Sequence, residues 1–134
     1  MTALKDDVLE YNKLLFPDTN LQTIVVRMIL NRETEDAINL LSNFYGIHPP
    51  KLFVGTIKGK RRTVHAVYVE NKQSVYAANS TIFYNPFIML HEFYHHLRSR
   101  GTGHRGSEKN ANFFAKNFID SYKNYISTQG GQYL

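Results

Sequence analysis

Cysteine is absent from this chain of 134 residues. It can therefore form neither a disulfide nor a metal site built on thiolates, and any bound metal would need histidine and carboxylate ligands. The sequence also lacks the run of about 18 apolar residues that a membrane span requires. No basic N-terminal segment followed by an apolar stretch is present. We therefore expect a soluble, cytoplasmic protein without a membrane partner.

Internal repeats and low-complexity segments are absent as well, and the length suits one domain with a real core. We expect that single domain over 1–134, with an N-terminal helical region in 1–32 and a flexible tail in 127–134. Apolar spacing predicts helices over 4–15, 20–31 and 33–45, the last stopped by Gly46. Strands are predicted over 51–57 and 63–70, joined by a turn at 58–62, and over 75–78 and 81–84. The expected fold class is α+β.

One short motif carries chemistry: residues 91–95 read HEFYH, which fits the pattern H-E-x-x-H. Histidines at i and i+4 lie one turn apart on a helix face, so His91 and His95 can bind one metal ion. Glu92 lies beside them as the candidate general base for a water molecule at that ion. Chance would produce the pattern in about one such chain in a hundred. The competing interpretation is that both histidines are ordinary helix residues.

The residues around the motif predict a helix from about 86 to 100. Asn85 is a suitable N-cap, Pro86 suits the first helical position, and Gly101 is a natural stop. Most of the helix surface is apolar, so we expect the helix to be embedded with the motif facing a cleft. His96 is expected at the cleft or the surface. Buried imidazoles and carboxylates need polar partners, and a metal ion supplies one.

A catalytic zinc ion usually has three protein ligands, so a third is needed after His95. A helix is predicted from Glu108, capped by Ser107, to about residue 126, with Glu108 on its apolar, core-facing stripe. Metal coordination explains a carboxylate there, and we favour it over simple capping of the helix dipole. His104, in the preceding loop, is an alternative ligand. A metzincin would need its third histidine at Gly101, so that class is excluded.

These motifs resemble the ImmA/IrrE-like group of gluzincin metallopeptidases. That group has H-E-x-x-H followed by a helix of pattern E-x-x-A-[ND]-x-F-A, and residues 108–115 read EKNANFFA here. A strand ending in asparagine at 81–85 and the segment 43–54 extend the likeness over roughly residues 35–120. Tyr94 departs from the glycine of many members, and the interval before Glu108 is short. A histidine followed by glycine, here His104 and Gly106, also faintly resembles the SprT-like proteases.

The resemblance implies a zincin-like fold with N-terminal helices, a small sheet of three to four strands that is mostly antiparallel or mixed, and two further helices. The first of these helices holds the motif and the second the glutamate ligand. It implies that His91, His95 and Glu108 bind one zinc ion and that Glu92 is the catalytic acid/base of peptide hydrolysis. In such peptidases an extended substrate pairs with the edge strand beside the motif helix. The expected partner is therefore a peptide or protein substrate, and that substrate could be one specific regulator.

Three further residues are candidates for supporting roles. Asn112 lies one turn after Glu108 and is either a hydrogen-bond donor that orients a metal ligand or a plain surface residue. Hydrolysis also needs a donor to the reaction's oxyanion, for which His104 and Tyr84 are candidates.

The formal net charge of +5 raises the alternative of an acidic partner or nucleic acid. Basic residues cluster at 58–62 and at Arg98, Arg100 and Arg105. We favour a solvated turn for the first cluster. The alternative function is a DNA-associated or regulatory protein-binding module whose zinc site is structural or non-proteolytic. A third interpretation is a latent peptidase with a terminal segment in its cleft.

Overall fold

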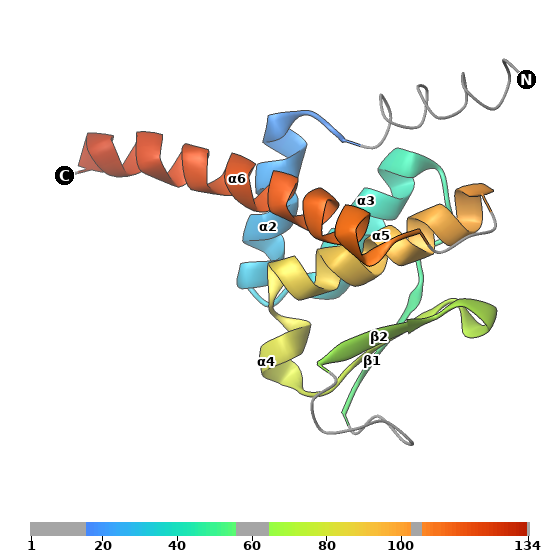
Figure 1. Ribbon diagram of the computed structural model, residues 1–134. Helices are drawn as coiled ribbons and strands as arrows, with labels where there is room; N and C mark the ends of the chain where they lie inside the picture. Colours follow the sequence, from blue (N-terminus) through green and yellow to red (C-terminus); the bar gives the residue numbers. More distant parts are fainter. Residues whose placement is uncertain (1–15, 56–64, 103–105, 134) are drawn as a thin grey trace, which may run out of the picture.

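The computed structural model describes residues 16–55, 65–102 and 106–133 (Figure 1). The predicted helix over 4–15 and the predicted turn at 58–62 lie outside these residues. The described part of the chain is α+β, as expected, with a small mixed sheet and five α-helices. In chain order the elements are α2 (Thr19–Leu30), α3 (Thr34–Tyr45), β1 (Lys51–Val54), β2 (Ala66–Val69), the 3-10 helix η1 (Glu70–Lys72), β3 (Ser74–Ala77), α4 (Ser80–Phe83), α5 (Pro86–Thr102) and α6 (Glu108–Tyr133).

The sheet has the strand order β1-β3-β2. β3 is parallel to β1 and antiparallel to β2, and Tyr76 of β3 lies between Phe53 of β1 and Val67 of β2. The first two strands, β1 and β2, are not paired with each other, because β3 lies between them. The short connection through η1 explains this order. Gln73 has a φ of 48°, and this tight turn brings β3 back antiparallel along β2.

Residues 81–84, which we predicted as a strand, belong to helix α4 and its C-cap. The Asn79 side chain accepts a hydrogen bond from the backbone N–H of Ile82 at 3.0 Å and so starts a helical turn. Ile82 and Phe83 are buried by that turn. Local capping therefore prevails over the strand preference of this β-branched and aromatic segment.

The capping residues predicted for the longer helices are in place. The Asn85 side chain accepts from the N–H of Ile88 at 3.0 Å at the start of α5. The Ser107 hydroxyl accepts from the N–H of Asn110 at 3.1 Å at the start of α6. Gly46 ends α3 with a φ of 69°, in the left-handed region that glycine tolerates best.

Both C-terminal helices run further than predicted. α5 continues through Gly101 to Thr102, and α6 continues to Tyr133. The residues 127–133, expected as a flexible tail, are therefore helical. A glycine within a helix costs only about 1 kcal/mol relative to alanine, which does not by itself end a helix.

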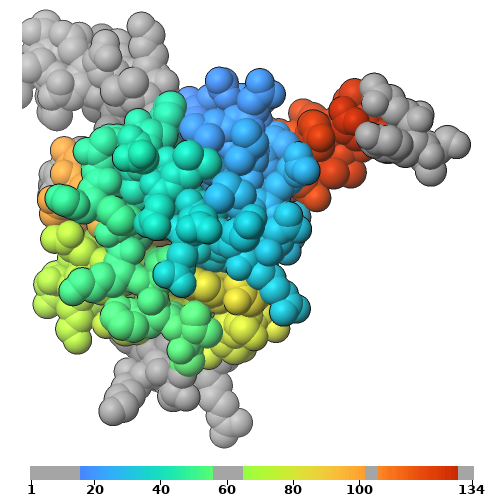
Figure 2. All heavy atoms as spheres, turned by 180° about the vertical axis from the view of Figure 1, so that it is seen from behind, coloured from blue at the N-terminus to red at the C-terminus, as the bar shows by residue number. Residues whose placement is uncertain are grey.

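Helix α5 lies at the centre of the structure, between the sheet and the helices α2 and α6 (Figure 1). Seen from behind, α2, α3 and β1 form most of the surface, and the C-terminal part of α6 extends beyond α2 (Figure 2). The apolar faces predicted for α5 and α6 are buried against each other. They consist of Leu90, Phe93, Tyr94 and Leu97 on α5 and Ala111, Phe114, Ala115 and Phe118 on α6. No helix of the described residues is long and apolar enough to span a membrane.

Candidate metal centre

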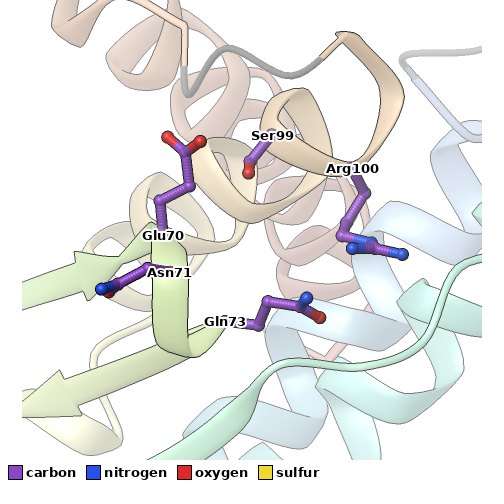
Figure 3. A pocket seen from close by; sticks show the side chains of 5 residues that line it. All are labelled: Glu70, Asn71, Gln73, Ser99 and Arg100. Carbon is purple, nitrogen blue, oxygen red and sulfur yellow. The ribbon is translucent and has the colours of Figure 1, made fainter.

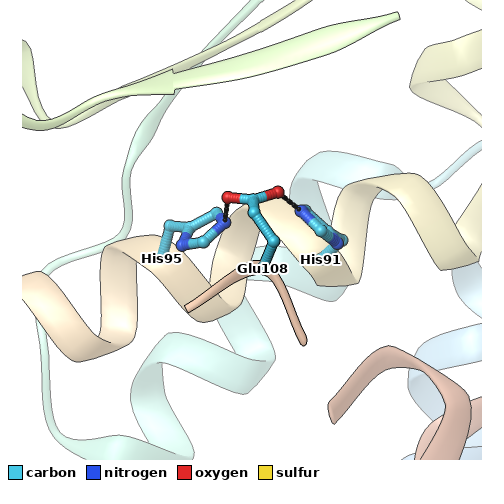
Figure 4. Close-up of side chains that lie close together, drawn as sticks. All are labelled: His91, His95 and Glu108. Carbon is cyan, nitrogen blue, oxygen red and sulfur yellow. Dashed lines mark hydrogen bonds and ion pairs between the residues drawn. The ribbon is translucent and has the colours of Figure 1, made fainter. Parts of the chain in front are cut away.

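The two motif histidines and Glu108 converge on one point (Figure 4). Glu108 Oε1 lies 2.9 Å from His91 Nε2, and Glu108 Oε2 lies 2.8 Å from His95 Nε2. One ligand atom from each residue lies within 4.8 Å of those of the other two. Glu108 follows His95 by 13 positions and His91 by 17, and the three residues together form a group that could hold a metal ion.

Packing between α5 and α6 brings the three together. Phe114 of α6 stacks on Phe93 of α5 at 6.4 Å and contacts Tyr94 at 5.4 Å between ring centroids. Just before α6 the chain passes directly against α5 at Gly106, whose φ is 79°. A Cβ there would lie 2.7 Å from Tyr94 Cε2, so only glycine allows this approach. The first turn of α6, with Glu108, is thereby held beside the motif.

Burial across the group is uneven. His95 is fully buried and His91 is partly buried, whereas the Glu108 side chain is 68% exposed. The expectation that Glu108 faces the core is therefore wrong, although its carboxylate does reach both histidines. The first turn of α6 lies at the rim of the α5–α6 contact, so its acidic residue meets solvent on one side. A donor group open on one side suits a catalytic metal site better than a closed structural one.

Asn112 contacts His91, but its side-chain oxygen accepts a hydrogen bond, whereas the sequence had suggested a donor. Its Oδ1 lies 2.8 Å from His91 Nδ1. Because a carbonyl oxygen only accepts, Nδ1 carries the hydrogen and donates it. In the neutral ring Nε2 then has the lone pair, which points at the Glu108 carboxylate.

This tautomer tests whether a metal ion fits the site. The lone pair on His91 Nε2 and the Glu108 carboxylate oxygen are both acceptors, and they lie 2.9 Å apart. Two acceptors this close need either a cation that binds both or a proton on one of them. A divalent cation satisfies this requirement and can bind both histidines at once, whereas without a metal ion His91 would have to be an imidazolium to donate to both Asn112 and Glu108. With two imidazoles and one carboxylate, the donor set also matches that of catalytic zinc. The residues present therefore fit a metal ion.

Glu92 lies next to the donor group, where a general base is needed. It is buried, at 7% exposure, and its Oε2 lies 3.8 Å from His91 Nε2. Glu92 also lines the cavity that opens beside His91. Its carboxylate is therefore within reach of a molecule bound at the histidines.

The cavity beside the donor group has a volume of about 270 Å³. Part of its wall was not foreseen: His65 and Ala66 at the start of β2, and Phe87 in the first turn of α5. These residues form no periodic pattern with the motif, and only the packing of the sheet against α5 brings β2 opposite it. The full lining is His65, Ala66, Phe87, Ile88, His91, Glu92 and Asn112.

Tyr84, a candidate oxyanion donor, is not brought to this group. The Tyr84 ring lies over the guanidinium of Arg32 at 5.5 Å and lines a separate cavity with Leu30, Ser80 and Thr81. Because α4 takes the place of the predicted strand, Tyr84 has a different position, and its assignment as oxyanion donor is not supported. His104 lies outside the described residues.

His96 is a core residue, not the cleft or surface residue that we expected. It is fully buried, and its Nε2–H donates to the carbonyl oxygen of His48 at 2.8 Å. The Tyr68 hydroxyl donates to Nδ1 at 2.8 Å. Burial lowers the pKa of His96, and the nearby Arg100 also lowers it, while the hydrogen bond to His48 opposes them. His96 is therefore a neutral link between α5, β2 and the α3–β1 loop.

A larger, polar cavity of about 520 Å³ lies between η1 and the end of α5 (Figure 3). Its lining is Glu70, Asn71, Gln73, Ser99 and Arg100. None of the residues predicted for catalysis or metal binding is among them. The smaller cavity is the chemical candidate, because the donor group and Glu92 are there.

Comparisons with protein-family models, with curated proteins and with solved structures give no match. A functional assignment must therefore come from the geometry of the site.

Proposed function

We propose that the chain is a zinc-dependent peptidase in which His91, His95 and Glu108 hold the ion and Glu92 is the general base. The fold would then be zincin-like, as the resemblance to ImmA/IrrE-like peptidases implies. One observation carries the proposal: two imidazole nitrogens and a solvent-facing carboxylate converge beside a second, buried carboxylate and an open cavity. A metal group with an adjacent base is the combination that hydrolysis of an unactivated amide needs.

When bound, zinc would supply Lewis acidity, polarising a carbonyl and lowering the pKa of water to about 7. Glu92 accepts a proton from the attacking water and delivers it to the leaving amine nitrogen as the C–N bond breaks. The partly apolar surroundings of Glu92 strengthen its interactions with reacting groups. Asn112 keeps His91 in the tautomer that presents Nε2.

The edge of the sheet supports a peptide as substrate. The carbonyl oxygen of His65 accepts from the N–H of Ala78, the residue after β3, at 2.8 Å. In an antiparallel pair, alternate residues bond to the partner, so the backbone N–H and C=O of Ala66 point away from β3. Ala66 lines the cavity beside the metal group. An extended peptide can therefore pair with this edge of β2 while it lies across the site.

Metal analysis of four purified proteins tests the proposal. The unaltered chain should bind a single zinc ion, His91→Ala should lose it, and Glu108→Ala should bind it weakly. Glu92→Gln should keep the zinc and lose peptide hydrolysis, because an amide cannot accept the proton. Absence of metal in the unaltered chain, even after incubation with zinc, would refute the proposal.

DNA binding of the unaltered chain and of a further variant, Glu92→Ala, tests the alternative of a regulatory module. Such a module would bind zinc without cleaving any peptide. Its binding to duplex DNA would weaken as salt rises and would be unchanged in Glu92→Ala. That combination would favour the DNA-associated interpretation over the peptidase.

A further inference from the structure

The cavity beside the metal group combines two kinds of wall. Its polar side consists of His91, Glu92 and Asn112, which the proposed function already uses, and His65 at the start of β2. Its other side is apolar and comes from two elements: Ala66 of β2, and Phe87 and Ile88 from the first turn of α5. The exposed lining surface is mostly apolar. Polar residues thus face the bond to be cut, and an apolar wall stands next to them.

The cavity is large enough to take one side chain. Its volume of about 270 Å³ lies below the range of about 300–1,000 Å³ that holds a whole small-molecule ligand. A peptide paired with the edge of β2 would keep its backbone outside and could place a single side chain within. The apolar wall would remove that side chain from water, which favours apolar groups.

Charged side chains fit this cavity poorly. An acidic side chain would face the buried carboxylate of Glu92 and would be repelled. A basic side chain would pair with Glu92 and occupy the group that must accept a proton. Either charge would also lose its hydration against Ala66, Phe87 and Ile88.

Phe87 alone would not carry this argument, because isolated apolar residues on a protein surface are normal. It is 38% exposed, and its position at the rim of the same cavity, next to Ile88, makes it part of one apolar wall. That wall lines the same cavity as His91 and Glu92.

We propose that this cavity is a specificity subsite, and that the substrates are peptides with an apolar residue adjacent to the scissile bond. The proposal rests on the proposed peptidase function. Ala66, Phe87 and Ile88, which form its apolar wall, are its specificity-determining residues.

A degenerate library of end-blocked peptides tests the substrate class. The zinc-loaded protein is incubated with the library, and cleavage sites are read by mass spectrometry against Glu92→Gln. The expected result is enrichment of leucine, isoleucine, valine, methionine or phenylalanine at one position beside the cut. Cleavage without apolar enrichment would overturn this inference and leave the peptidase standing. No cleavage above Glu92→Gln would refute the peptidase, and the inference with it.

Two variants with opposite effects test the residues. Ala66→Val narrows the subsite, and kcat/KM for a phenylalanine peptide should fall about tenfold or more relative to its alanine counterpart. Ile88→Ala widens the subsite and should shift the same ratio towards phenylalanine. Ile24→Ala is the matched control, because Ile24 is 44% exposed on α2 and is absent from the lining.

Thermal unfolding shows whether each variant is folded. Valine suits a strand, so Ala66→Val keeps the test valid if Ile88→Ala fails to fold. An unchanged phenylalanine-to-alanine ratio in the folded variants would overturn the assignment of these residues.

Discussion

Replacing Asn112 by alanine should weaken zinc binding without weakening the fold. In the structure Asn112 Oδ1 accepts the hydrogen on His91 Nδ1 at 2.8 Å, which keeps the lone pair on Nε2. Without this acceptor the imidazole can take either tautomer and can rotate. Part of the binding free energy is then spent on restoring the orientation.

The size of the effect follows from the surroundings of this contact. Loss of a partner that orients a metal-bound histidine typically weakens metal binding about 10- to 100-fold. Asn112 is exposed, so water can replace its oxygen as the acceptor. We therefore expect a loss near the lower end, about tenfold, or about 1.4 kcal/mol. Asn112→Asp should bind zinc at least as tightly as the unaltered chain, because a carboxylate makes a stronger, charge-assisted hydrogen bond.

Equilibrium competition with a chromophoric zinc chelator measures these affinities. Asn124→Ala is the matched control: it makes the same substitution at an exposed position of α6, three turns beyond Asn112. Thermal unfolding of the metal-free proteins should show similar midpoints for all variants. If Asn112→Ala binds zinc as tightly as Asn124→Ala, the hydrogen bond from His91 to Asn112 does not orient the imidazole for zinc binding, and the prediction is refuted.

Three predictions concern the packing around the site. Gly106→Ala should lower the free energy of unfolding by about 1–3 kcal/mol in urea titrations, because its Cβ would overlap the Tyr94 ring; an unchanged value would show that the chain relaxes there. Tyr68→Phe should cost about 1–3 kcal/mol in the same assay by leaving a buried acceptor on His96 without its donor, and a neutral result would contradict that hydrogen bond. Burial lowers the pKa of His96 below 6.5, so near that pH the unfolded chain binds more protons than the folded chain. The free energy of unfolding should therefore keep the contribution of His96 above pH 6.5 and lose it as the pH falls below 6.5. In chelator-treated protein, the free energy of unfolding of His96→Gln should decrease less from pH 7.5 to 5.5 than that of the unaltered chain. Equal decreases would show that His96 does not cause the pH dependence.

Local sequence signals predicted the two helices that form the site. The i, i+4 spacing of His91 and His95, the cap at Asn85 and the cap at Ser107 all act within one or two helical turns. The apolar stripe of α6 predicted which of its faces meets α5. Together these signals predicted that Glu108 lies close to the histidines, but they did not predict that its side chain is exposed.

Residues that depend on tertiary pairing were predicted poorly. Ala66 lines the cavity because β3 inserts between β1 and β2, and no local pattern encodes that order. The roles of His96 and Tyr68 were missed because a polar pair 28 positions apart becomes visible only when both are buried. Tyr84 was misplaced because capping by Asn79 turned an apparent strand into a helix.

The adjacent residues His95 and His96 have opposite surroundings. One is directed at Glu108, and the other at Tyr68 and the His48 carbonyl. Successive residues of a helix are separated by about 100° around its axis, so these contacts act on α5 from two sides. A large rotation of α5 about its axis would break both hydrogen bonds of His96. The rotational setting of the ligand-bearing helix is thus fixed from the core, and transplanting this metal site into another scaffold would require the contacts behind the helix as well.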